Sequence, residues 1–174
     1  PISCTINPTV GKEKETESMP AAKVKRVLVV GGGPGGLEAA RVAALRGHSV
    51  TLYEKTNKLG GQFGISALAP FKQENASAIS WLSGQVKRNG VKVEMGKEVT
   101  AKLIDELKPE VVIVASGAVP IIPDIPGVDR PNVVTAVDVL AGVVKVIGKG
   151  VIIGGGLTGC ETADLLGERG VEVT

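Results

Sequence analysis

The sequence is poor in aromatic residues and in cysteines, and its apolar runs are short. Its 174 residues include one tryptophan, one tyrosine, two phenylalanines and two cysteines. So few aromatics argue against a base-stacking platform for nucleic acid, and two distant cysteines give no disulfide framework. Apolar stretches such as Val27–Val30 and Val111–Ala115 are too short to cross a bilayer. We therefore expect a cytoplasmic protein without membrane contact.

The sequence also lacks an excess of charge of one sign. Twenty lysines and arginines face eighteen acidic residues, and the net charge is +2. The basic residues are scattered among acidic ones, which excludes the concentrated basic surface of a nucleic-acid-binding protein. The only histidine, His48, follows Gly47 in a turn and has no second ligand near it in the sequence, so we expect a surface position.

Glycine, in contrast, is abundant, and it falls in a pattern that occurs twice. Residues Val27–Thr51 read VLVVGGGPGGLEAARVAALRGHSVT, and Gly150–Thr174 read GVIIGGGLTGCETADLLGERGVEVT. Adding 123 to the residue number superimposes Gly31, Gly33 and Gly36 on Gly154, Gly156 and Gly159. Each copy is typical of a strand, a glycine-rich turn, a helix and the start of a second strand. Two such units in tandem suggest two dinucleotides held close enough for hydride transfer.

The pattern of apolar residues predicts alternating strands and helices. The expected strands are Lys25–Val30, Ser49–Tyr53, Val91–Met95, Val111–Ala115 and Val151–Ile153, and the expected helices are Leu37–Leu45, Asn75–Arg88 and Ala101–Leu107. Gly60–Phe71 is typical of a loop, and Val133–Leu140 of a short strand or helix. We expect Trp81 to pack its helix against the sheet. This alternation predicts an α/β fold with a Rossmann-like doubly wound parallel sheet and a truncated start of a second Rossmann unit.

The first glycine-rich turn has the residues that a dinucleotide site needs. Gly31 permits the tight turn, Gly33 lets the backbone approach a pyrophosphate, and Gly36 lets the helix pack closely. Pro34 suits the first turn of a helix, where its missing N–H is no loss. Glu54 ends the second strand, where a carboxylate can accept hydrogen bonds from ribose hydroxyls. The alternative is a glycine-rich turn that serves packing alone.

The second glycine-rich turn lacks the acidic residue that accompanies the first. The residue that corresponds to Glu54 would carry the number 177, beyond Thr174. The determinant of NAD or NADP preference is therefore missing, and the alternative is that this segment binds nothing by itself. Cys160 lies on the new helix where the first unit has Leu37, and we expect it to be a small packed residue. Because the chain opens on Pro1 and stops inside a strand, we expect it to be a piece of a longer polypeptide.

Several motifs together resemble one superfamily. VVGGGPGGLEAA, YEK at Tyr53–Lys55, LGGQF at Leu59–Phe63, VIVASGAVP at Ile113–Pro120 and VIIGGGLTGCETA are similar to the pyridine nucleotide-disulfide oxidoreductases that bind two dinucleotides. Within this superfamily, the chain resembles the C-terminal FAD- and NAD(P)-binding part of the NADH:flavin oxidoreductase group. That group includes NADH oxidase, 2,4-dienoyl-CoA reductase, enoate reductase and trimethylamine dehydrogenase. The resemblance covers residues 24–174.

The resemblance implies a set of cofactor contacts and no catalytic residue within the chain. The FAD contacts are Gly31, Gly33, Pro34, Gly35, Gly36, Glu54, Lys55, Gly61, Gln62, Val99, Ala115, Ser116 and Gly117, and the NAD(P)H contacts are Gly154, Gly156, Leu157, Thr158 and Gly159. In this scheme Lys55 lies beside the ribose or adenine, Val99 uses its backbone at the adenine, and Ala115–Gly117 forms a second turn near the flavin. Ser116 stands where the superfamily often has threonine.

The resemblance also implies a division of the chain into domains. Residues 1–22 would be a linker that follows a missing iron–sulfur region, 23–148 the first part of the FAD-binding domain, and 149–174 the truncated start of the NAD(P)-binding domain. PISCTINPTVG resembles the end of the iron–sulfur region, where Cys4 would be one ligand of a 4Fe–4S cluster in the parent protein only. Such a cluster needs four thiolates.

The resemblance predicts an oxidoreductase parent. NAD(P)H would reduce FAD, and electrons would pass through the 4Fe–4S cluster to FMN in a missing N-terminal barrel that reduces an enoate- or enoyl-type substrate. The present chain alone would be inactive, with its own barrel and a homo-oligomer as expected partners. Two alternatives stay open. One is an amine dehydrogenase of the trimethylamine type that holds ADP as a structural ligand, and the other is a non-catalytic nucleotide-binding module.

Overall fold

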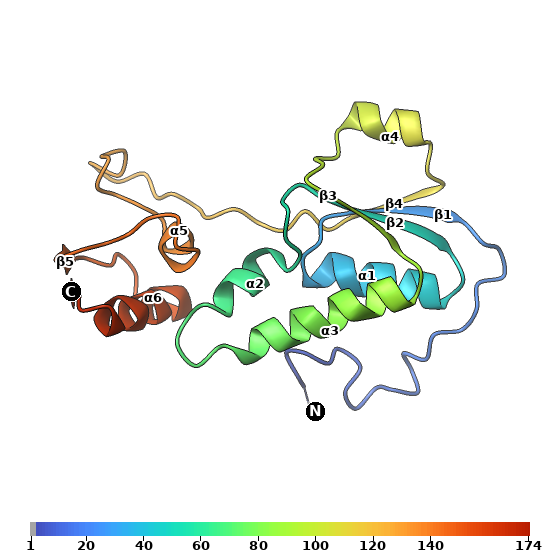
Figure 1. The fold of residues 1–174 in the computed structure, drawn as a ribbon, viewed down its shortest axis with the longest axis horizontal. Coiled ribbons are helices and arrows are strands. Elements are labelled where there is room, and N and C mark those ends of the chain that lie inside the picture. The colour runs from blue at the N-terminus through green and yellow to red at the C-terminus, as the bar shows by residue number, and fades with distance from the viewer. Residues whose placement is uncertain (1–2) are drawn as a thin grey trace. The chain divides into compact units, whose positions relative to one another are not determined.

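The computed structural model describes residues 3–174 and divides them into two compact units (Figure 1). Unit 1 contains the chain up to Gly61 together with Ser77–Gly117. Unit 2 contains Gln62–Ala76 and Ala118–Thr174. Among the described residues, none of the helices is long and apolar enough to span a membrane.

Unit 1 is built on a sheet of four parallel strands. These are β1 (Arg26–Val30), β2 (Ser49–Glu54), β3 (Lys92–Met95) and β4 (Val111–Val114), in the order β3-β2-β1-β4. In the centre, Val29 of β1 is in register with Leu52 of β2 on one side and Ile113 of β4 on the other. The predicted parallel α/β sheet is therefore confirmed, and the four strands begin and end within one residue of the predicted bounds.

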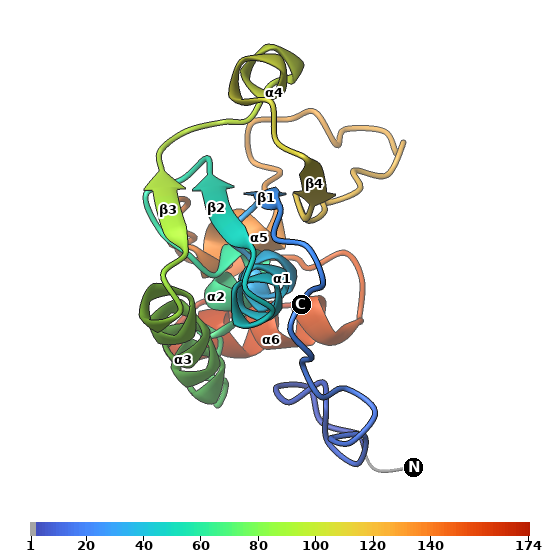
Figure 2. The ribbon, with the colours of Figure 1, turned by 90° about the vertical axis from the view of Figure 1, so that its right-hand side faces the viewer.

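Three helices cover the two faces of this sheet. α1 (Pro34–Leu45) and α3 (Glu74–Arg88) lie on one face, and α4 (Ala101–Leu107) lies on the other (Figure 2). Beneath α1, the side chains of Val29, Leu37, Ala40 and Leu52 have no exposed surface and form the centre of the core. Burying a leucine of this kind contributes about 1.5–3 kcal/mol. This core fixes the carboxyl ends of β1 and β2, where the glycine-rich turn begins.

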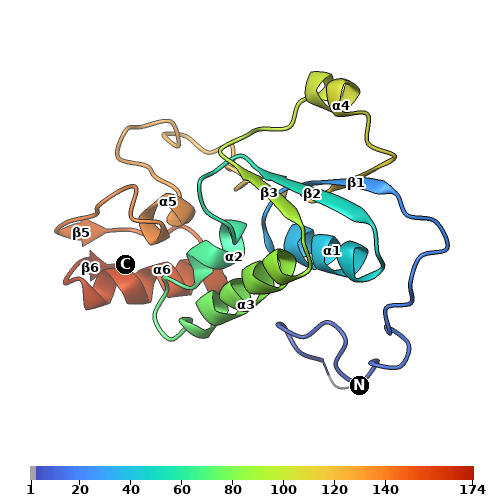
Figure 3. The ribbon, with the colours of Figure 1, turned by 45° about the vertical axis from the view of Figure 1, so that its right-hand side comes forward.

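Unit 2 has a smaller core and shorter elements. It contains α2 (Gly61–Ser66, apart from its first residue), α5 (Ala136–Leu140), β5 (Lys149–Gly150), α6 (Leu157–Glu168) and β6 (Glu172–Val173) (Figure 3). Two small clusters of buried residues hold it: Ala69, Leu140 and Leu165 form one, and Val139, Leu166 and Val171 the other. β5 and β6 pair in parallel, as the second copy of the pattern predicts.

Two sequence-based predictions for this part of the chain are wrong. Gly60–Phe71 contains the helix α2 rather than a loop throughout. Val151–Ile153 is not a strand, and β5 is limited to Lys149–Gly150. Val151 and Ile153 are 77% and 74% exposed, so burial of these side chains does not favour an extended strand. Val133–Leu140 was expected to contain a short strand or a short helix, and the structure has a helix there, α5.

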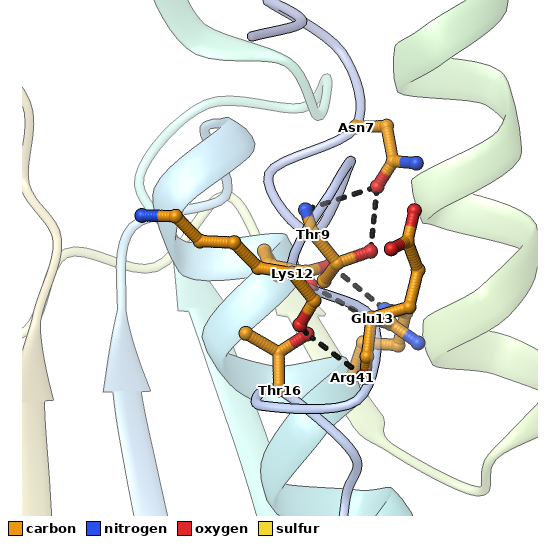
Figure 4. A network of polar contacts seen from close by, with 7 residues as sticks. Asn7, Thr9, Lys12, Glu13, Thr16 and Arg41 are labelled. Carbon is orange, nitrogen blue, oxygen red and sulfur yellow. Dashed lines mark hydrogen bonds and ion pairs between the residues drawn. The ribbon is translucent and has the colours of Figure 1, made fainter. Parts of the chain in front are cut away.

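The described part of the segment before β1 is a series of turns. The side-chain oxygen of Asn7 accepts hydrogen bonds from the N–H and hydroxyl of Thr9, at 3.0 and 2.8 Å, and the hydroxyl of Thr16 donates to the Lys12 carbonyl at 2.8 Å (Figure 4). The Ala21 N–H donates to the Arg46 carbonyl at 2.9 Å, which ties this segment to the end of α1.

The environment of Trp81 differs from the predicted one. Its side chain is 51% exposed instead of packed against the sheet, and the guanidinium of Arg41 on α1 lies 5.7 Å from the ring centroid. Arg41 is itself held by Glu38, whose two carboxylate oxygens each accept a hydrogen bond at 2.7 Å. Ile6–Thr9 of the N-terminal segment line a pocket together with these three side chains. The ring therefore joins α3 to α1 and borders the N-terminal segment.

Candidate nucleotide-binding site

The glycine-rich turn after β1 has no room for side chains at two positions. Gly31 has a φ of +108°, and a Cβ added there would lie 2.2 Å from the Ala115 carbonyl oxygen. A Cβ at Gly36 would lie 1.9 Å from the carbonyl oxygen of Gly31. Both distances are shorter than any van der Waals contact. The two glycines therefore let β1, α1 and the residues after β4 approach closely at the carboxyl end of the sheet.

At two positions between these glycines, Gly33 and Gly35, the backbone is open. A Cβ at Gly33 or Gly35 would meet no atom within 4 Å. Gly33 is the N-cap of α1 and supplies no side-chain cap, and Pro34 occupies the first helical position. The first N–H groups of a helix have no partner within the helix and carry a partial positive charge. Free space beside such groups suits an anionic group such as a pyrophosphate.

Glu54, at the end of β2, is directed at this turn. Its Oε2 accepts the N–H of Gly32 at 2.7 Å, and its Oε1 accepts the N–H and the hydroxyl of Thr56 at 2.8 and 2.9 Å. Only 7% of the residue is exposed. Burial raises the pKa of this carboxyl, but the hydrogen bonds from Thr56 and Gly32 outweigh that effect and lower the pKa below its ordinary value. Oε2 keeps one acceptor position for a ligand hydroxyl.

The segment before α2 packs on the other side of the turn. The Gly60 N–H donates to the Gly32 carbonyl at 2.8 Å. Gly61 has a φ of +52°, and a Cβ added there would lie 3.3 Å from the Cα of Gly33. A Cβ at Gly32 would lie 2.5 Å from a methyl group of Leu59. Gly61 is thus brought beside the open position at Gly33.

The loop after β3 adjoins the loop after β2. The Gly96 N–H donates to the Thr56 carbonyl at 2.9 Å, and the Lys97 N–H donates to the Glu54 carbonyl at 3.0 Å. Val99, half-buried, follows two residues later in this loop, and the exposed Lys55 follows Glu54 in the other. Both predicted contacts with the adenine or ribose therefore belong to loops at the same edge of the sheet.

The turn after β4 completes this edge. The Ala115 N–H donates to the Val30 carbonyl at 2.8 Å, and Gly117 has a φ of +76°. A Cβ at Gly31 would also lie 3.3 Å from the Cα of Ser116. The predicted residues of Ala115–Gly117 thus adjoin the first glycine-rich turn.

Unit 2 repeats the geometry of the first turn with its own residues. Gly154 has a φ of +110°, and a Cβ at Gly159 would lie 2.0 Å from the Gly154 carbonyl oxygen. The space around Gly156 is open, and Gly156 is the N-cap of α6. Leu157 is 81% exposed, and the Thr158 carbonyl accepts the hydroxyl of Thr162 at 2.7 Å.

Two further residues of unit 2 bear on the predictions. Gln62 donates a side-chain hydrogen bond to the Ala118 carbonyl, so its amide is engaged within the protein. Cys160 is exposed, and the expectation that it is packed is wrong. On α6 the buried positions are Thr162, Leu165 and Leu166 instead, because these residues face the small clusters of unit 2.

Cys4 is exposed, and His48 is half-buried. The Cys4 sulfur accepts the N–H of Asn7 at 3.4 Å, and the N–H groups of Asn7 and Ile6 lower the pKa of the thiol. Between residues 3 and 174, no cluster of three or more His, Cys, Asp or Glu side chains could hold a metal ion. We expected His48 at the surface, but it is partly covered there, and its Nδ1 accepts the N–H of Lys25 at 3.2 Å.

Sequence reasoning missed two residues of this site, Gly32 and Thr56. Gly32 was concealed in a run of three glycines, of which the motif uses the first and third. Thr56 lies two residues after β2, in a turn, where serine and threonine are common and do not by themselves indicate a site. Only its proximity to the Glu54 carboxylate, which the fold creates, gives it importance.

Comparison with known proteins identifies related sequences. Residues 25–174 match the family described as pyridine nucleotide-disulphide oxidoreductase. The chain is 45% identical to an NADH oxidase of Thermoanaerobacter brockii over 178 residues, which is 99% of this chain and 27% of the relative. It is 43% identical to a cinnamate reductase of Clostridium sporogenes, over 99% of this chain and 26% of that protein.

A solved structure shows the same fold. A complex of 2-naphthoyl-CoA reductase with 2-naphthoyl-CoA is similar with a TM-score of 0.92 and 41% sequence identity, over 98% of this chain and 26% of the other. The present chain thus spans about a quarter of the length of each of these three proteins.

Proposed function

Because this chain belongs to the pyridine nucleotide-disulphide oxidoreductase family, we propose that unit 1 binds the adenosine diphosphate part of FAD. The observation that carries the proposal is the carboxylate of Glu54, which accepts the N–H of Gly32 at 2.7 Å and keeps one acceptor position free. A ribose hydroxyl would occupy that position. The pyrophosphate would lie at the open backbone of Gly33 and Gly35, beside the first turn of α1.

The remaining residues of unit 1 would complete the FAD site. Lys55 and the backbone of Val99 would contact the ribose and adenine, Gly61 the pyrophosphate, and Ala115–Gly117 the part nearer the flavin. Gln62 would join the pyrophosphate contacts if its amide exchanged the Ala118 carbonyl for the cofactor. These assignments rest on the family resemblance and on the packing of Gly61 and Ala115 against the glycine-rich turn.

The second glycine-rich turn would receive NAD(P)H. Gly154, Gly156 and Gly159 repeat the backbone geometry of the first turn, with Leu157 and Thr158 at the start of α6. When bound, FAD would accept a hydride from NAD(P)H and pass its electrons on to further redox centres. This chain's own residues bind and orient the cofactors, and none of them needs to act as an acid or a base.

In the longer protein, this part would supply electrons for the reduction of an activated alkene. The names of the related cinnamate reductase and 2-naphthoyl-CoA reductase support an unsaturated acid or acyl thioester as substrate. In that protein, Cys4 would give one of the four thiolates of a 4Fe–4S cluster. FMN, bound in another part of that protein, would deliver the electrons to the substrate. By itself the present chain would bind cofactor without turnover.

The absorption spectrum of the purified chain after incubation with FAD and dialysis tests this proposal. Retained flavin bands, lost on addition of excess ADP, are the expected result. Thermal stabilisation by ADP without retained flavin would instead favour the alternative in which ADP is a structural ligand. A chain that binds neither FAD nor ADP would overturn the proposal.

A further inference from the structure

Thr56 contacts both the nucleotide-side carboxylate and the neighbouring loop, although the family resemblance assigns it no role. We propose that Thr56 is a positioning residue that holds the Glu54 carboxylate toward the ribose and links it to the loop that carries Val99. This inference rests on the proposed function, because it concerns the same nucleotide site.

The first part of the argument is the set of hydrogen bonds to the carboxylate. Oε1 of Glu54 receives both donors of Thr56, the N–H at 2.8 Å and the hydroxyl at 2.9 Å. Oε2 receives only the Gly32 N–H at 2.7 Å. Because Thr56 occupies one oxygen, it fixes the rotation of the carboxylate and leaves the free position on the oxygen that faces the glycine-rich turn.

The second part concerns the backbone of the same residue. The Thr56 carbonyl accepts the N–H of Gly96 at 2.9 Å. Gly96 has a φ of +68°, which favours glycine, and a Cβ there would lie 2.7 Å from the side-chain oxygen of Asn57. Thr56 therefore connects the carboxylate at the end of β2 with the loop after β3.

The hydroxyl has a second acceptor within reach. The Lys58 carbonyl lies 2.8 Å from Thr56 Oγ1, and the single hydroxyl proton can go to only one of the two acceptors at a time. A carboxylate is the stronger acceptor because it is charged. Protonation of Glu54 would remove this advantage, and the hydroxyl would then turn to Lys58.

Few charged groups lie near Glu54, so the hydrogen bonds from Thr56 have a principal effect on the pKa of its carboxyl. Lys55 is the charged neighbour that lowers the pKa of Glu54, and the glycine-rich turn brings only the N–H of Gly32. On the loop after β3, the ammonium of Lys97 pairs with Glu94. Lys97 contacts Glu54 only through its backbone N–H, which donates to the Glu54 backbone carbonyl. Removing the Thr56 hydroxyl therefore leaves the charges unchanged. It removes one donor to Glu54 and the oxygen that accepts the Lys58 N–H at 3.4 Å.

The test compares T56V, which lacks the hydroxyl, with T56S, which keeps it, in the 174-residue chain. Thr56 is exposed, so neither change removes buried packing. T5V, at an exposed position of the N-terminal segment, is the matched control. The pKa of the Glu54 carboxyl is measured by NMR on glutamate-labelled protein, with the signal identified by its loss in E54Q, and ADP affinity is measured by calorimetry.

We expect T56V to raise the pKa of Glu54 and to weaken ADP binding about three- to tenfold, the net effect of one ordinary hydrogen bond. T56S and T5V should behave like the unchanged chain. An unchanged pKa of Glu54 in T56V, or equal ADP affinity of T56V and the unchanged chain, would overturn the inference. If the unchanged chain binds no ADP, the proposed function fails, and the NMR titration still decides whether Thr56 holds the carboxylate.

Discussion

Gly36 and Gly31 are so close that a Cβ on Gly36 would lie 1.9 Å from the Gly31 carbonyl oxygen. Gly159 and Gly154 have the same relationship in unit 2, at 2.0 Å. In each pair, the first turn of a helix packs directly on the backbone of the preceding turn. The close approach fixes the helix N-terminus relative to the strand, and this is the geometry on which the proposed nucleotide sites depend.

The first prediction separates packing from binding. G36A should lower the free energy of unfolding by about 1–3 kcal/mol or more, because the added methyl group forces backbone to move. G33A is the matched control, since its methyl group would enter open space and the φ of −73° suits alanine. G33A should leave stability nearly unchanged but weaken ADP binding. Urea unfolding and calorimetry measure the two effects, and a G36A variant as stable as the unchanged chain would contradict the packing argument.

The second prediction concerns the pH dependence of stability. The folded-state pKa of Glu54 is lowered below the ordinary value of 4.5, so its ionised form stabilises the fold. This contribution is present above the unfolded-state pKa and is lost as the pH falls through the folded-state pKa. E54Q should therefore be less stable than the unchanged chain at neutral pH, and the difference should shrink in acid. A difference that stays constant down to the lowest pH at which both proteins fold would contradict this assignment.

A third prediction concerns Arg41 and the single tryptophan. Arg41 joins Glu38 through two hydrogen bonds and lies over the Trp81 ring. R41A should lower the free energy of unfolding by about 1 kcal/mol and change the fluorescence of Trp81, the only tryptophan in the chain. R41K keeps the charge without the two-pronged geometry, and its stability should be intermediate. Unaltered fluorescence in R41A would show that Arg41 does not cover the ring.

The fourth prediction concerns a half-buried carboxylate on β3, Glu94. The ammonium groups of Lys97 and Lys92 hold the pKa of Glu94 at about 2. K97A should raise this pKa toward the ordinary value, and high salt should do the same in the unchanged chain because exposed charges are screened. K102A, which alters a lysine paired with Glu106 instead, is the control. NMR titration of the glutamate carboxyls measures each value.

The parts of the fold that could be predicted from sequence are those with a strong local pattern. Apolar runs ending at glycine gave β1 and β4, and the Thr100 cap and Pro109 surround α4 at the predicted residues. The helix α2 could not be predicted, because its sequence GQFGIS contains two glycines and none of its residues is buried. Val151–Ile153 has the composition of a strand, and the Ile152 N–H donates to the Thr174 carbonyl at 2.8 Å. The strand β5 nevertheless stops at Gly150, and Val151 and Ile153 are left exposed.

The candidate site likewise contains residues that the local sequence identifies and contacts that only the fold creates. Its glycines are identified by their spacing, because a position with no room for a side chain is occupied by glycine in both copies of the pattern. The hydrogen bonds of Glu54 are not identified in this way, because they depend on how the ends of β1 and β2 meet. Cys160 and Trp81 are informative errors: an apolar residue type on a helix indicates burial only when the rest of the unit offers a surface to cover it.

The N-termini of α1 and α6 begin at glycines that supply no side-chain cap. In most helices a serine, threonine or aspartate at this position satisfies a free N–H and stabilises the helix by about 1 kcal/mol. In the proposed function, a phosphate would provide that stabilisation instead. A bound nucleotide would therefore act as the missing cap, and cofactor loading and folding of each unit would be a single linked equilibrium.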